Sequence, residues 1–481
     1  MNIRDLEPRQ VWEQFEAITK VPRPSKKEER IIEFLIDFAK QHQLEWQRDE
    51  IGNVVIRKGA TPGYEQRETI ILQSHMDMVC EKNSDVDFDF ETQPIRAVVD
   101  GEWVRAEGTT LGADCGIGMA AAMALLLDEQ AEHGPIEALF TVDEETGLTG
   151  AFNLGEGMLN GRYLLNLDSE DEGEIFIGCA GGIDTVATFA LSQEEAPAGY
   201  IFYRVDVKDL CGGHSGDDIN KGRANSNKLI ARLMLSAQEQ LGARVSRIEG
   251  GNLRNAIPRE AYAVVGVLEE NVAAFEELVH SYTNSVKDTF AATEPDMNIT
   301  LSRVEGITSV LTLDLQSRLL LALVNVANGV IAMSKAVDGL VETSTNLASV
   351  KVVGEEIVVT TSQRSSVESD KIAIKESVHN CFAASGAVVE HSDGYPGWAP
   401  NPDSLLLKRT VESYVRLFGV EPKVKAVHAG LECGLFLEKY PQLEMVSFGP
   451  TLRGVHSPDE RLEIATVDKF WRHLKEVVKS I

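Results

Sequence analysis

Three consecutive carboxylates follow a mostly apolar run in the N-terminal part of the chain. The run, residues 136–142, has the composition of a buried strand, and Asp143, Glu144 and Glu145 stand directly after it. Adjacent carboxylates repel one another, and the end of a strand leaves them little room to spread. Such crowding is tolerable when a cation lies among them. The stretch is therefore interpreted as one wall of a two-metal hydrolytic site.

The other walls of such a site require imidazoles and carboxylates from elsewhere in the chain. Two divalent ions need one imidazole and one carboxylate each, together with a carboxylate that bridges them. Side chains of these types follow apolar strand-like runs, stand in a glycine-rich turn before an apolar helix, or lie near the C-terminus. The predicted metal ligands are His75, Asp114, Glu145, Asp168 and His456. Mixed ligation of this kind suits Zn²⁺, with Co²⁺ and Mn²⁺ as alternatives.

Two further carboxylates have predicted roles in catalysis. Asp77 lies two residues after His75, so on an extended chain it projects to the same side. There it can hydrogen-bond the imidazole and select its tautomer. Glu144 neighbours a ligand, and a carboxylate in that place can take a proton from a water molecule and pass it to the leaving amine.

Each of these residues also has an ordinary structural explanation. A histidine at a strand end is usually a satisfied structural residue, Glu144 and Glu145 alone would form a solvated turn, and residues 168–172 are an acidic run. Their shared placement favours the metal site, because ligands of parallel α/β sheets bind outside the carboxyl ends of the strands.

The elements that must position these residues alternate between strands and helices. Residues 69–74, 136–142 and 163–167 are predicted strands, and 119–127 is a predicted apolar helix. This alternation favours a mostly parallel sheet that is covered on both faces. Near the N-terminus, Ser25 to Glu28 has the pattern of a capping box, which predicts a helix from there to about His42. Residues 44–47 and 53–57 are predicted to form a hairpin.

The alternation of predicted strands and helices stops in the middle of the chain and resumes near the C-terminus. The predicted architecture is an α/β catalytic domain, residues 1–182 and 398–481, interrupted by an inserted α+β lid at 183–397. Within the lid, two successive sets of paired strands and helices suggest a structural duplication, although the residues show no convincing repeat. A length of 481 residues agrees with more than one domain.

Composition excludes several classes of partner. The formal net charge of −29 argues against binding to nucleic acid or to an anionic membrane. The six cysteines are scattered without a CxxC pair, so neither a thiolate zinc finger nor a thioredoxin motif is present. The N-terminus lacks the apolar core of a signal peptide, and no apolar stretch reaches membrane-spanning length. We therefore expect a reduced, cytoplasmic protein.

Five blocks of this sequence, in this order, resemble the active-site blocks of the co-catalytic zinc peptidases related to aminoacylase and carboxypeptidase G. The blocks are His75–Val79, Gly112–Gly118, Asp143–Gly147, Leu167–Glu170 and Gly454–Pro458. The resemblance implies that Asp114 bridges two zinc ions, that His75 and Asp168 bind one of them, and that Glu145 and His456 bind the other. It also implies that Glu144 is the general base and acid. Cys115 departs from the asparagine expected after the bridging aspartate, at a junction where the family has a cis peptide bond.

The same resemblance extends into the lid. His214, within Gly212–Gly216, resembles the family histidine that stabilises the developing oxyanion. Asn255 and Arg364 resemble residues that hold the substrate, and the fork of the arginine suits a C-terminal carboxylate. Structural alternatives are a simple turn at His214, a turn cap at Asn255 and an acidic partner for Arg364. In the returning domain, Glu432 could face a substrate amino group.

The implied activity is that of a metallo-dipeptidase acting on Xaa-His and other dipeptides of the carnosine type. The alternatives that keep the same site are an N-acyl amino acid deacylase and a tripeptidase. A different class is a non-enzymatic metal-binding scaffold on a peptidase fold. The resemblance also implies a homodimer, and it leaves open whether His214 serves the site of its own chain or that of a partner.

Overall fold

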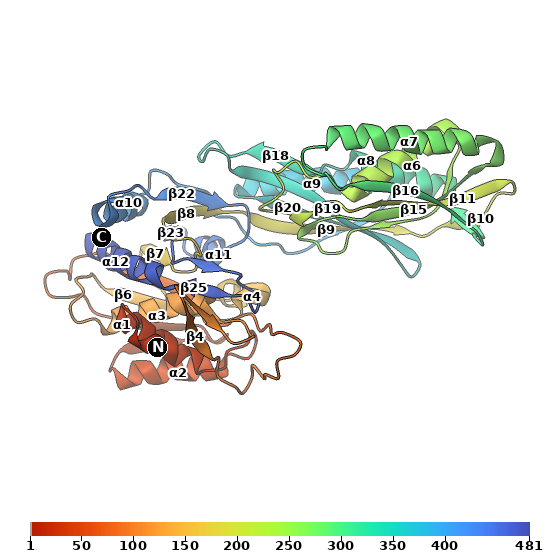
Figure 1. Ribbon diagram of the computed structural model, residues 1–481. Helices are drawn as coiled ribbons and strands as arrows, with labels where there is room; N and C mark the ends of the chain where they lie inside the picture. The colour runs from red at the N-terminus through yellow and green to blue at the C-terminus, as the bar shows by residue number, and fades with distance from the viewer. Residues whose placement is uncertain (1) are drawn as a thin grey trace. The chain divides into compact units, whose positions relative to one another are not determined.

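The computed structural model describes residues 2–481, and its contacts divide the chain into two compact units (Figure 1). The first unit comprises the chain up to Gly178 together with Pro400–Ala426 and Leu431–Ile481. The second comprises Cys179–Ala399 and the short segment Val427–Gly430. The sequence predicted domain boundaries at 182/183 and 397/398. It did not anticipate that residues 427–430 join the second unit.

The first unit is built on an eight-stranded sheet in the order β1-β2-β6-β3-β7-β23-β8-β22. The four central strands β6, β3, β7 and β23 are mutually parallel, while β1, β2 and β8 pair antiparallel with their neighbours. The predicted α/β class with a mostly parallel central sheet is confirmed. The strands are β1 (Glu45–Arg48), β2 (Val54–Lys58), β3 (Ile70–His75), β6 (Ile136–Thr141), β7 (Tyr163–Asn166), β8 (Glu174–Cys179), β22 (Lys423–Val427) and β23 (Glu444–Ser447).

Helices pack against this sheet, and the most deeply buried of them is α3. It is apolar on all sides, which is typical of a helix enclosed by other elements, and it packs against α1 and β3. The helices of this unit are α1 (Arg9–Thr19), α2 (Glu29–Gln41), α3 (Ala113–Leu127), α4 (Glu144–Gly147), α5 (Thr149–Phe152), α10 (Leu405–Phe418), α11 (Glu432–Lys439) and α12 (Ile464–Ser480), with a 3₁₀ turn at Ile3–Asp5.

A smaller antiparallel sheet joins the two ends of this unit. Its order is β24-β25-β5-β4, with β4 at Ala97–Asp100, β5 at Trp103–Ala106, β24 at Leu452–Arg453 and β25 at Arg461–Glu463. The sequence indicated none of these strands, because they are short and only partly apolar. The sheet holds the loop between β24 and β25, which carries His456.

The second unit is an antiparallel sheet covered by helices, which confirms the predicted α+β insertion. The strands follow the order β16-β11-β15-β13-β19-β20-β9-β21, and β18 also pairs with β19. Helices α6, α7, α8 and α9 lie along one face of the sheet in Figure 1, and their apolar side chains share one core with the strands. The main elements are β9 (Gly181–Ala190), β11 (Tyr200–Lys208), α6 (Ser226–Leu241), β13 (Arg244–Gly250), β15 (Ala261–Leu268), α7 (Val272–Thr289), β16 (Asn298–Val304), α8 (Leu313–Asn325), β18 (Gly329–Met333), β19 (Val341–Val353), β20 (Glu356–Ser365), α9 (Glu368–Ala384) and β21 (Val388–His391).

Short elements complete the second unit. Strands β10 (Gln193–Glu195) and β17 (Ser309–Leu311) form one small pair, and β12 (Gly213–His214) and β14 (Ala256–Ile257) form another. A 3₁₀ turn lies at Glu269–Asn271. Among residues 2–481, no helix is long and apolar enough to cross a membrane.

One local prediction is wrong. The capping box at Ser25–Glu28 does not form: α2 begins at Glu29, and its N-cap Glu28 makes no side-chain capping bond. Instead, the Ser25 hydroxyl donates to Asp77 Oδ2 at 2.8 Å, and Glu28 Oε1 accepts the backbone N–H of Asp143 at 3.0 Å. Tertiary partners therefore take both side chains away from the helix terminus. The predicted hairpin of β1 and β2 is confirmed.

Candidate active site

The carboxyl ends of the parallel strands bring the predicted ligands together. In the register of β3 and β6, His75 stands beside Thr141, so the chain leaving β6 passes His75 on its way to Glu144. In the register of β3 and β7, Gln73 stands beside Asn166, which places Asp168 just beyond the same edge. This convergence is the arrangement expected at the ligand-binding edge of an α/β sheet.

The five predicted ligands form two matched halves around Asp114. On one side, His75 Nε2 lies 3.1 Å from Asp114 Oδ1 and 3.3 Å from Asp168 Oδ1. On the other, His456 Nε2 lies 3.3 Å from Asp114 Oδ2 and 3.0 Å from Glu145 Oε2. Each oxygen of Asp114 therefore faces a different histidine, and each histidine has one further carboxylate.

The charges at this cluster fit divalent cations. Burial alone would raise the pKa of Asp114, but contacts with His456 and His75 hold it well below its usual range. Hydrogen bonds to Asp114 and Glu145 raise the pKa of His456 to about 11. The carboxylates thus stabilise positive charge beside the imidazoles. A bound metal ion would carry such a charge. Glu145 Oε1 is buried without a hydrogen-bond partner, and Asp168 Oδ1 is buried with His75 Nε2 3.3 Å away, so both oxygens could serve as acceptors for such an ion.

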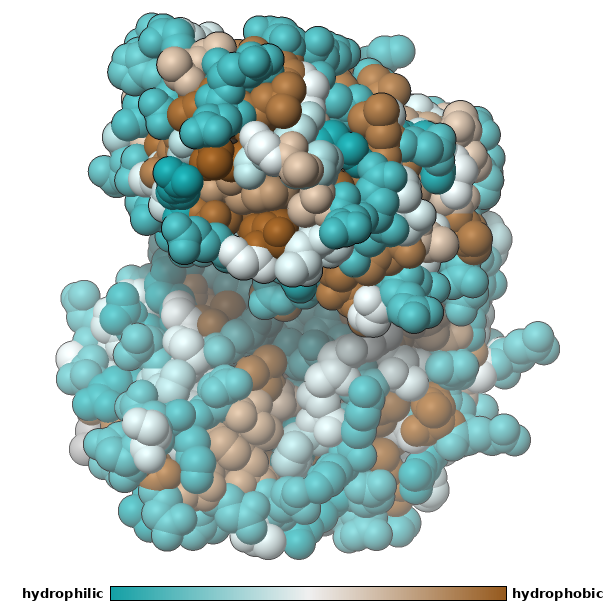
Figure 2. Space-filling model, turned by 90° about the vertical axis from the view of Figure 1, so that its right-hand side faces the viewer, coloured by the Kyte–Doolittle hydropathy of each residue, from teal (hydrophilic) through white to brown (hydrophobic). Residues whose placement is uncertain are grey.

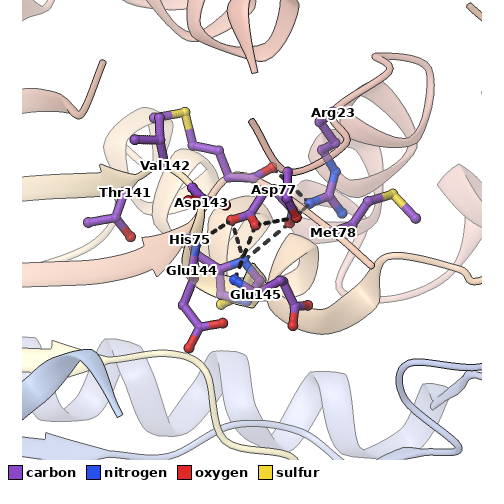
Figure 3. A network of polar contacts seen from close by, with 12 residues as sticks. Arg23, His75, Asp77, Met78, Thr141, Val142, Asp143, Glu144 and Glu145 are labelled. Atoms are coloured by element: carbon purple, nitrogen blue, oxygen red, sulfur yellow. Dashed lines mark hydrogen bonds and ion pairs between the residues drawn. The ribbon is translucent and has the colours of Figure 1, made fainter. Parts of the chain in front are cut away.

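Asp77 connects His75, a predicted ligand, with Glu144, the predicted proton carrier. Its Oδ1 lies 3.3 Å from His75 Nδ1, so the other ring nitrogen is turned toward Asp114. Its two oxygens also accept the backbone N–H groups of Glu144 at 3.0 Å and Glu145 at 3.2 Å. Figure 3 shows the Asp77 carboxylate among these contacts, while the Glu144 side chain extends away from them. The backbone carbonyl of Asp77 also lies 3.1 Å from His75 Nδ1, so Asp77 orients the imidazole through two oxygens while its carboxylate holds the short helix α4.

Glu144 has the environment of a proton-transfer group. Burial, reinforced by the nearby carboxylates of Asp168, Glu432 and Glu145, raises its pKa well above the ordinary value. A carboxylate with a raised pKa both accepts and releases a proton readily near neutral pH. The hydrogen bond to Asp77 involves the backbone N–H of Glu144 and leaves its carboxylate available.

Asp143, which had no predicted role, closes the turn between β6 and α4. Its backbone is left-handed (φ 50°), a conformation that aspartate tolerates better than most residues. Its Oδ1 accepts the Thr146 hydroxyl at 2.5 Å, and its Oδ2 accepts the Thr149 hydroxyl. The three consecutive carboxylates therefore differ in their surroundings: Asp143 holds the turn, Glu145 contacts His456, and Glu144 lies near both of them, where burial raises its pKa.

Glu432 lies in the same unit, at the first residue of α11. Its Oε2 accepts Gln73 Nε2 at 2.6 Å and the Thr141 hydroxyl at 2.9 Å, while its Oε1 is buried without a partner. Burial raises its pKa to about 8. Gln73 and Thr141 lie on β3 and β6, so the structure brings Glu432 to the same edge of the sheet as the ligands.

His214 and Asn255 are neighbours in the second unit. His214 lies on β12, opposite Ala256 of β14, and the backbone carbonyl of Asn255 accepts the N–H of Ser215 at 2.8 Å. His214 Nδ1 accepts the backbone N–H groups of Gly216 and Asp217, both at 3.3 Å. Asp217 Oδ2 also lies 3.5 Å from this nitrogen, so the backbone and side chain of one short segment hold the Nδ1 side of the ring. The side chain of Asn255 is exposed.

Arg364, on β20, is a buried cation whose donors are only partly used. Its Nη1 donates to the Tyr395 hydroxyl at 3.2 Å, and its Nε is buried without a partner. His428 belongs to the same unit. Its Nε2 forms a hydrogen bond with Ser344 Oγ at 2.7 Å, and its Nδ1 is buried without a side-chain hydrogen bond. Burial, with the nearby Arg364 charge, lowers the pKa of His428 to about 4. This environment suits an anionic ligand group.

Several site residues were missed by sequence reasoning. Ser25 and Glu28 were assigned to a helix cap, and Arg23 stands between two prolines with no motif around it. His428 lies in a segment whose membership of the second unit depends on long-range contacts. Glu460, four residues after His456, had only its proximity to a ligand as a signal. The peptide bond between Asp114 and Cys115 is cis, as the resemblance predicted.

Comparison with known proteins identifies the family. The sequence model of Peptidase family M20/M25/M40 matches residues 71–480. The cytosol non-specific dipeptidase of Escherichia coli (strain K12) is 41% identical over 479 residues, which is 100% of this chain and 99% of that protein.

Solved structures agree with that match. Aminoacylhistidine dipeptidase from Vibrio alginolyticus has a TM-score of 0.95 at 43% identity, covering 100% of this chain and 98% of that one. Aminopeptidase PepT from Bacillus cereus shares the fold, with a TM-score of 0.57 at 15% identity over 99% of each chain. The resemblance noted in the sequence is confirmed: the chain belongs to Peptidase family M20/M25/M40 and is a metallopeptidase.

Proposed function

We propose that this metallopeptidase is a dipeptidase that hydrolyses Xaa-His and other dipeptides of the carnosine type. The observation that carries the proposal is the two-sided cluster around Asp114, with Glu144 beside it. The names of the E. coli and Vibrio relatives, a non-specific dipeptidase and an aminoacylhistidine dipeptidase, support the same substrate class.

We assign the metal ligands as two sets that share Asp114. His75 and Asp168 would hold one ion, and Glu145 and His456 the other. When bound, the two divalent ions would acidify a water molecule and polarise the scissile carbonyl. Imidazole and carboxylate ligands together favour Zn²⁺, and Co²⁺ or Mn²⁺ would also fit.

The residues of the chain supply the proton transfers. Glu144 takes the proton from the attacking water and delivers it to the nitrogen of the leaving amino acid, as its raised pKa allows. Asp77 keeps His75 in the tautomer whose Nε2 faces the cluster, and it holds α4 so that Glu144 keeps its position.

The substrate-binding roles are assigned to four further residues. His214 would donate from Nε2 to the carbonyl oxygen as negative charge develops there. Arg364 would bind the C-terminal carboxylate through its unused donors, with Asn255 as a further contact. Glu432, whose Oε1 has no partner, would face the amino group of the substrate.

A panel of substrates tests this proposal. Purified protein is assayed with carnosine, Ala-His, tripeptides and N-acetyl amino acids, with and without a chelator, and its metal content is measured. We expect chelator-sensitive cleavage of the dipeptides. Preferential cleavage of the N-acetyl amino acids or tripeptides would instead identify a deacylase or tripeptidase. Metal binding without any hydrolysis would identify a scaffold.

We also propose a homodimer in the cytoplasm. On β18, Val330, Ile331 and Met333 are 37%, 48% and 45% exposed, so this strand presents apolar side chains to solvent. The face of the molecule in Figure 2 also carries apolar patches among hydrophilic residues. The location is supported by the name of the E. coli relative. Light scattering of the purified chain should give twice the mass of 52.7 kDa, and cell fractionation tests the location.

A further inference from the structure

Two oppositely charged side chains are buried on either side of one peptide group in the metal-binding unit. Arg23 and Glu460 are both only 2% exposed, and both contact the peptide units of Gly112. Buried charges are costly unless they are paired or fully hydrogen-bonded. Their contacts with the surrounding backbone therefore need an explanation.

Glu460 accepts hydrogen bonds from the turn that carries Asp114, the proposed bridging ligand. Its carboxylate accepts four consecutive backbone N–H groups, from Leu111 at 2.7 Å, Gly112 at 2.9 Å, Ala113 at 2.7 Å and Asp114 at 3.3 Å. Glu460 follows His456 by four residues in the same loop. The carboxylate therefore ties the loop of the last ligand to the turn of the bridging ligand.

Arg23 donates a hydrogen bond to the same turn from the other side. Its Nη1 donates to the carbonyls of Met76 at 2.9 Å and Asp77 at 2.6 Å, and its Nη2 donates to the carbonyl of Gly112. Figure 3 shows Arg23 directed at the segment that contains Asp77. The guanidinium therefore ties the end of β3, with His75 and Asp77, to the turn that leads to Asp114.

The glycines of this turn leave room for the guanidinium. A Cβ on Gly112 would lie 2.6 Å from Arg23 Nη2, and a Cβ on Gly116 would lie 2.7 Å from the same atom. Gly112 also has a φ of 70°, which side chains rarely adopt. The glycine-rich sequence before α3 is thus matched to Arg23.

We propose that Arg23 and Glu460 act as a pair of positioning residues that set the spacing of His75, Asp114 and His456 and thereby the affinity for metal. The inference rests on the metal-ligand assignment proposed above. It assigns the pair no contact with substrate. Neutralising Glu460 would cost two of its four hydrogen bonds and remove one of the two carboxylates whose charge acts on Arg23, the other being Asp77, so the turn would shift relative to both histidines.

Glu137 provides a matched control. It is also a buried carboxylate, 2% exposed, that accepts backbone N–H groups, from Asn160 at 2.9 Å and Gly161 at 3.0 Å. It also pairs with an arginine, Arg57, at 3.1 Å. Glu137 lies on β6 near the strand's beginning, away from the metal ligands. Glu137→Gln therefore perturbs stability in the same way without touching the turn.

The test measures metal binding instead of hydrolysis. Chelator-treated full-length wild type, Glu460→Gln and Glu137→Gln are titrated with Co²⁺, and the visible absorption of the bound ion and its competition with a chromophoric chelator are recorded. Glu460→Gln should bind Co²⁺ about 10- to 100-fold more weakly than wild type, with an altered spectrum. Glu137→Gln should match wild type in both. Glu460→Asp, which keeps the charge, should lose less affinity than Glu460→Gln.

Each result decides the proposal. Wild-type affinity and spectrum in Glu460→Gln would overturn it, and so would an equal loss in Glu137→Gln. If both Glu460 variants were insoluble while Glu137→Gln folded, Glu460 would be a folding residue and the inference would fail. If wild type bound no Co²⁺, the proposed function would fail first, before the role of the pair came into question.

Discussion

At the scale of single residues, the site depends on carboxylates that differ in what surrounds them. Asp77 is buried, yet contacts with His75 and the N–H of Glu144 lower its pKa below the ordinary value. Glu144, whose backbone N–H binds Asp77, has a raised pKa because burial and the nearby carboxylates outweigh the opposing effect of His75. Environment therefore favours the ionised form of Asp77 and the protonated form of Glu144, which agrees with the proposed proton transfer by Glu144.

The variant Glu144→Gln tests the proton carrier. The amide is nearly isosteric but cannot accept the proton of the attacking water, so kcat should fall by about 10²- to 10⁴-fold. KM and the metal content should stay close to wild type, because the side chain is not one of the proposed ligands. Steady-state kinetics with a dipeptide and metal analysis provide the measurements. Normal turnover with two metals bound would rule out the assigned role.

Arg364→Met tests recognition of the substrate carboxylate. A charge-assisted hydrogen bond to a buried carboxylate is worth about 1.5–3 kcal/mol, so KM for a dipeptide should rise by about 10- to 100-fold. The corresponding dipeptide amide lacks the carboxylate, and its KM should hardly change. Metal content serves as the control. An equal rise in KM for both substrates would assign Arg364 to the structure of the second unit instead.

At the scale of elements, α3 and β7 must approach closely for Asp114 and Asp168 to meet. Gly118 of α3 makes this possible, because a Cβ there would lie 2.5 Å from the carbonyl oxygen of Leu167. Cys115 lies at the same contact, and its Sγ donates a hydrogen bond to Leu167 O at 3.4 Å. The residue after Leu167 is the proposed ligand Asp168.

Gly118→Ala should therefore destabilise the protein, although alanine is the better helix former. Helix propensity alone would favour alanine by about 1 kcal/mol, whereas overpacking costs typically about 1–3 kcal/mol. Displacement of Leu167 should also weaken metal binding. Urea unfolding and metal titration measure both effects. Gly59→Ala, where a Cβ meets nothing within 4 Å, is the control. Increased stability of Gly118→Ala would contradict the close contact.

The contact between α10 and α12 should depend on pH through His473. This buried imidazole donates from Nε2 to Thr410 O at 2.9 Å, and burial lowers its pKa from 6.5 to about 4. The folded state therefore binds fewer protons than the unfolded state. The stability is complete above pH 6.5 and falls as the pH drops toward 4, by about 3 kcal/mol for this group.

His473→Gln should remove that part of the acid sensitivity, because glutamine can donate to the same carbonyl without titrating. The free energy of unfolding is measured by urea denaturation between pH 7 and pH 4 for both proteins. Both are treated with chelator, so that loss of metal contributes equally. An unchanged pH dependence in the variant would show that His473 does not carry the effect.

At the scale of the whole molecule, the proposed metal ligands all lie in one of the two units, so metal should stabilise the units unequally. At a free metal concentration of 100 times Kd, the first unit should gain about 2.7 kcal/mol. Four of the five tryptophans, Trp12, Trp46, Trp103 and Trp471, lie in that unit. Chelator should therefore lower the thermal transition seen by tryptophan fluorescence.

Far-UV circular dichroism provides the comparison, because it reports both units. After chelation, circular dichroism should show two thermal transitions. That of the second unit should keep its temperature, and that of the first unit should fall together with the fluorescence transition. A single transition that shifts by the same amount in both signals would mean that the two units unfold as one.

Much of the site could be predicted from the sequence because its ligands follow strands. An apolar run that ends in His75 or Asp168 indicates both the strand and the edge at which the side chain lies. The glycines before and after Asp114 indicate a tight turn into a helix. These are local patterns, and parallel strands convert them into spatial neighbours without further information.

Other parts of the site could not be predicted, because their partners are distant in the chain. Ser25 and Glu28 match a helix cap equally well on local grounds, but Asp77 and the N–H of Asp143 are their actual partners. The short strands β24 and β25 have no hydrophobic pattern of their own. Arg23 and Glu460 are separated by 437 positions and meet only at Gly112.

The sequence by itself determined the family, the α/β class with its insertion, and the residue types of a two-metal site, because these follow from local hydrophobic patterns and ordered motifs. Only the tertiary structure decided that Asp143 holds the turn after β6 through Thr146 and Thr149, and which buried charges contact the turn at Asp114. The physical reason is that hydrogen-bond partners and desolvation depend on what the folded chain places around each group, and a local pattern carries no record of those surroundings.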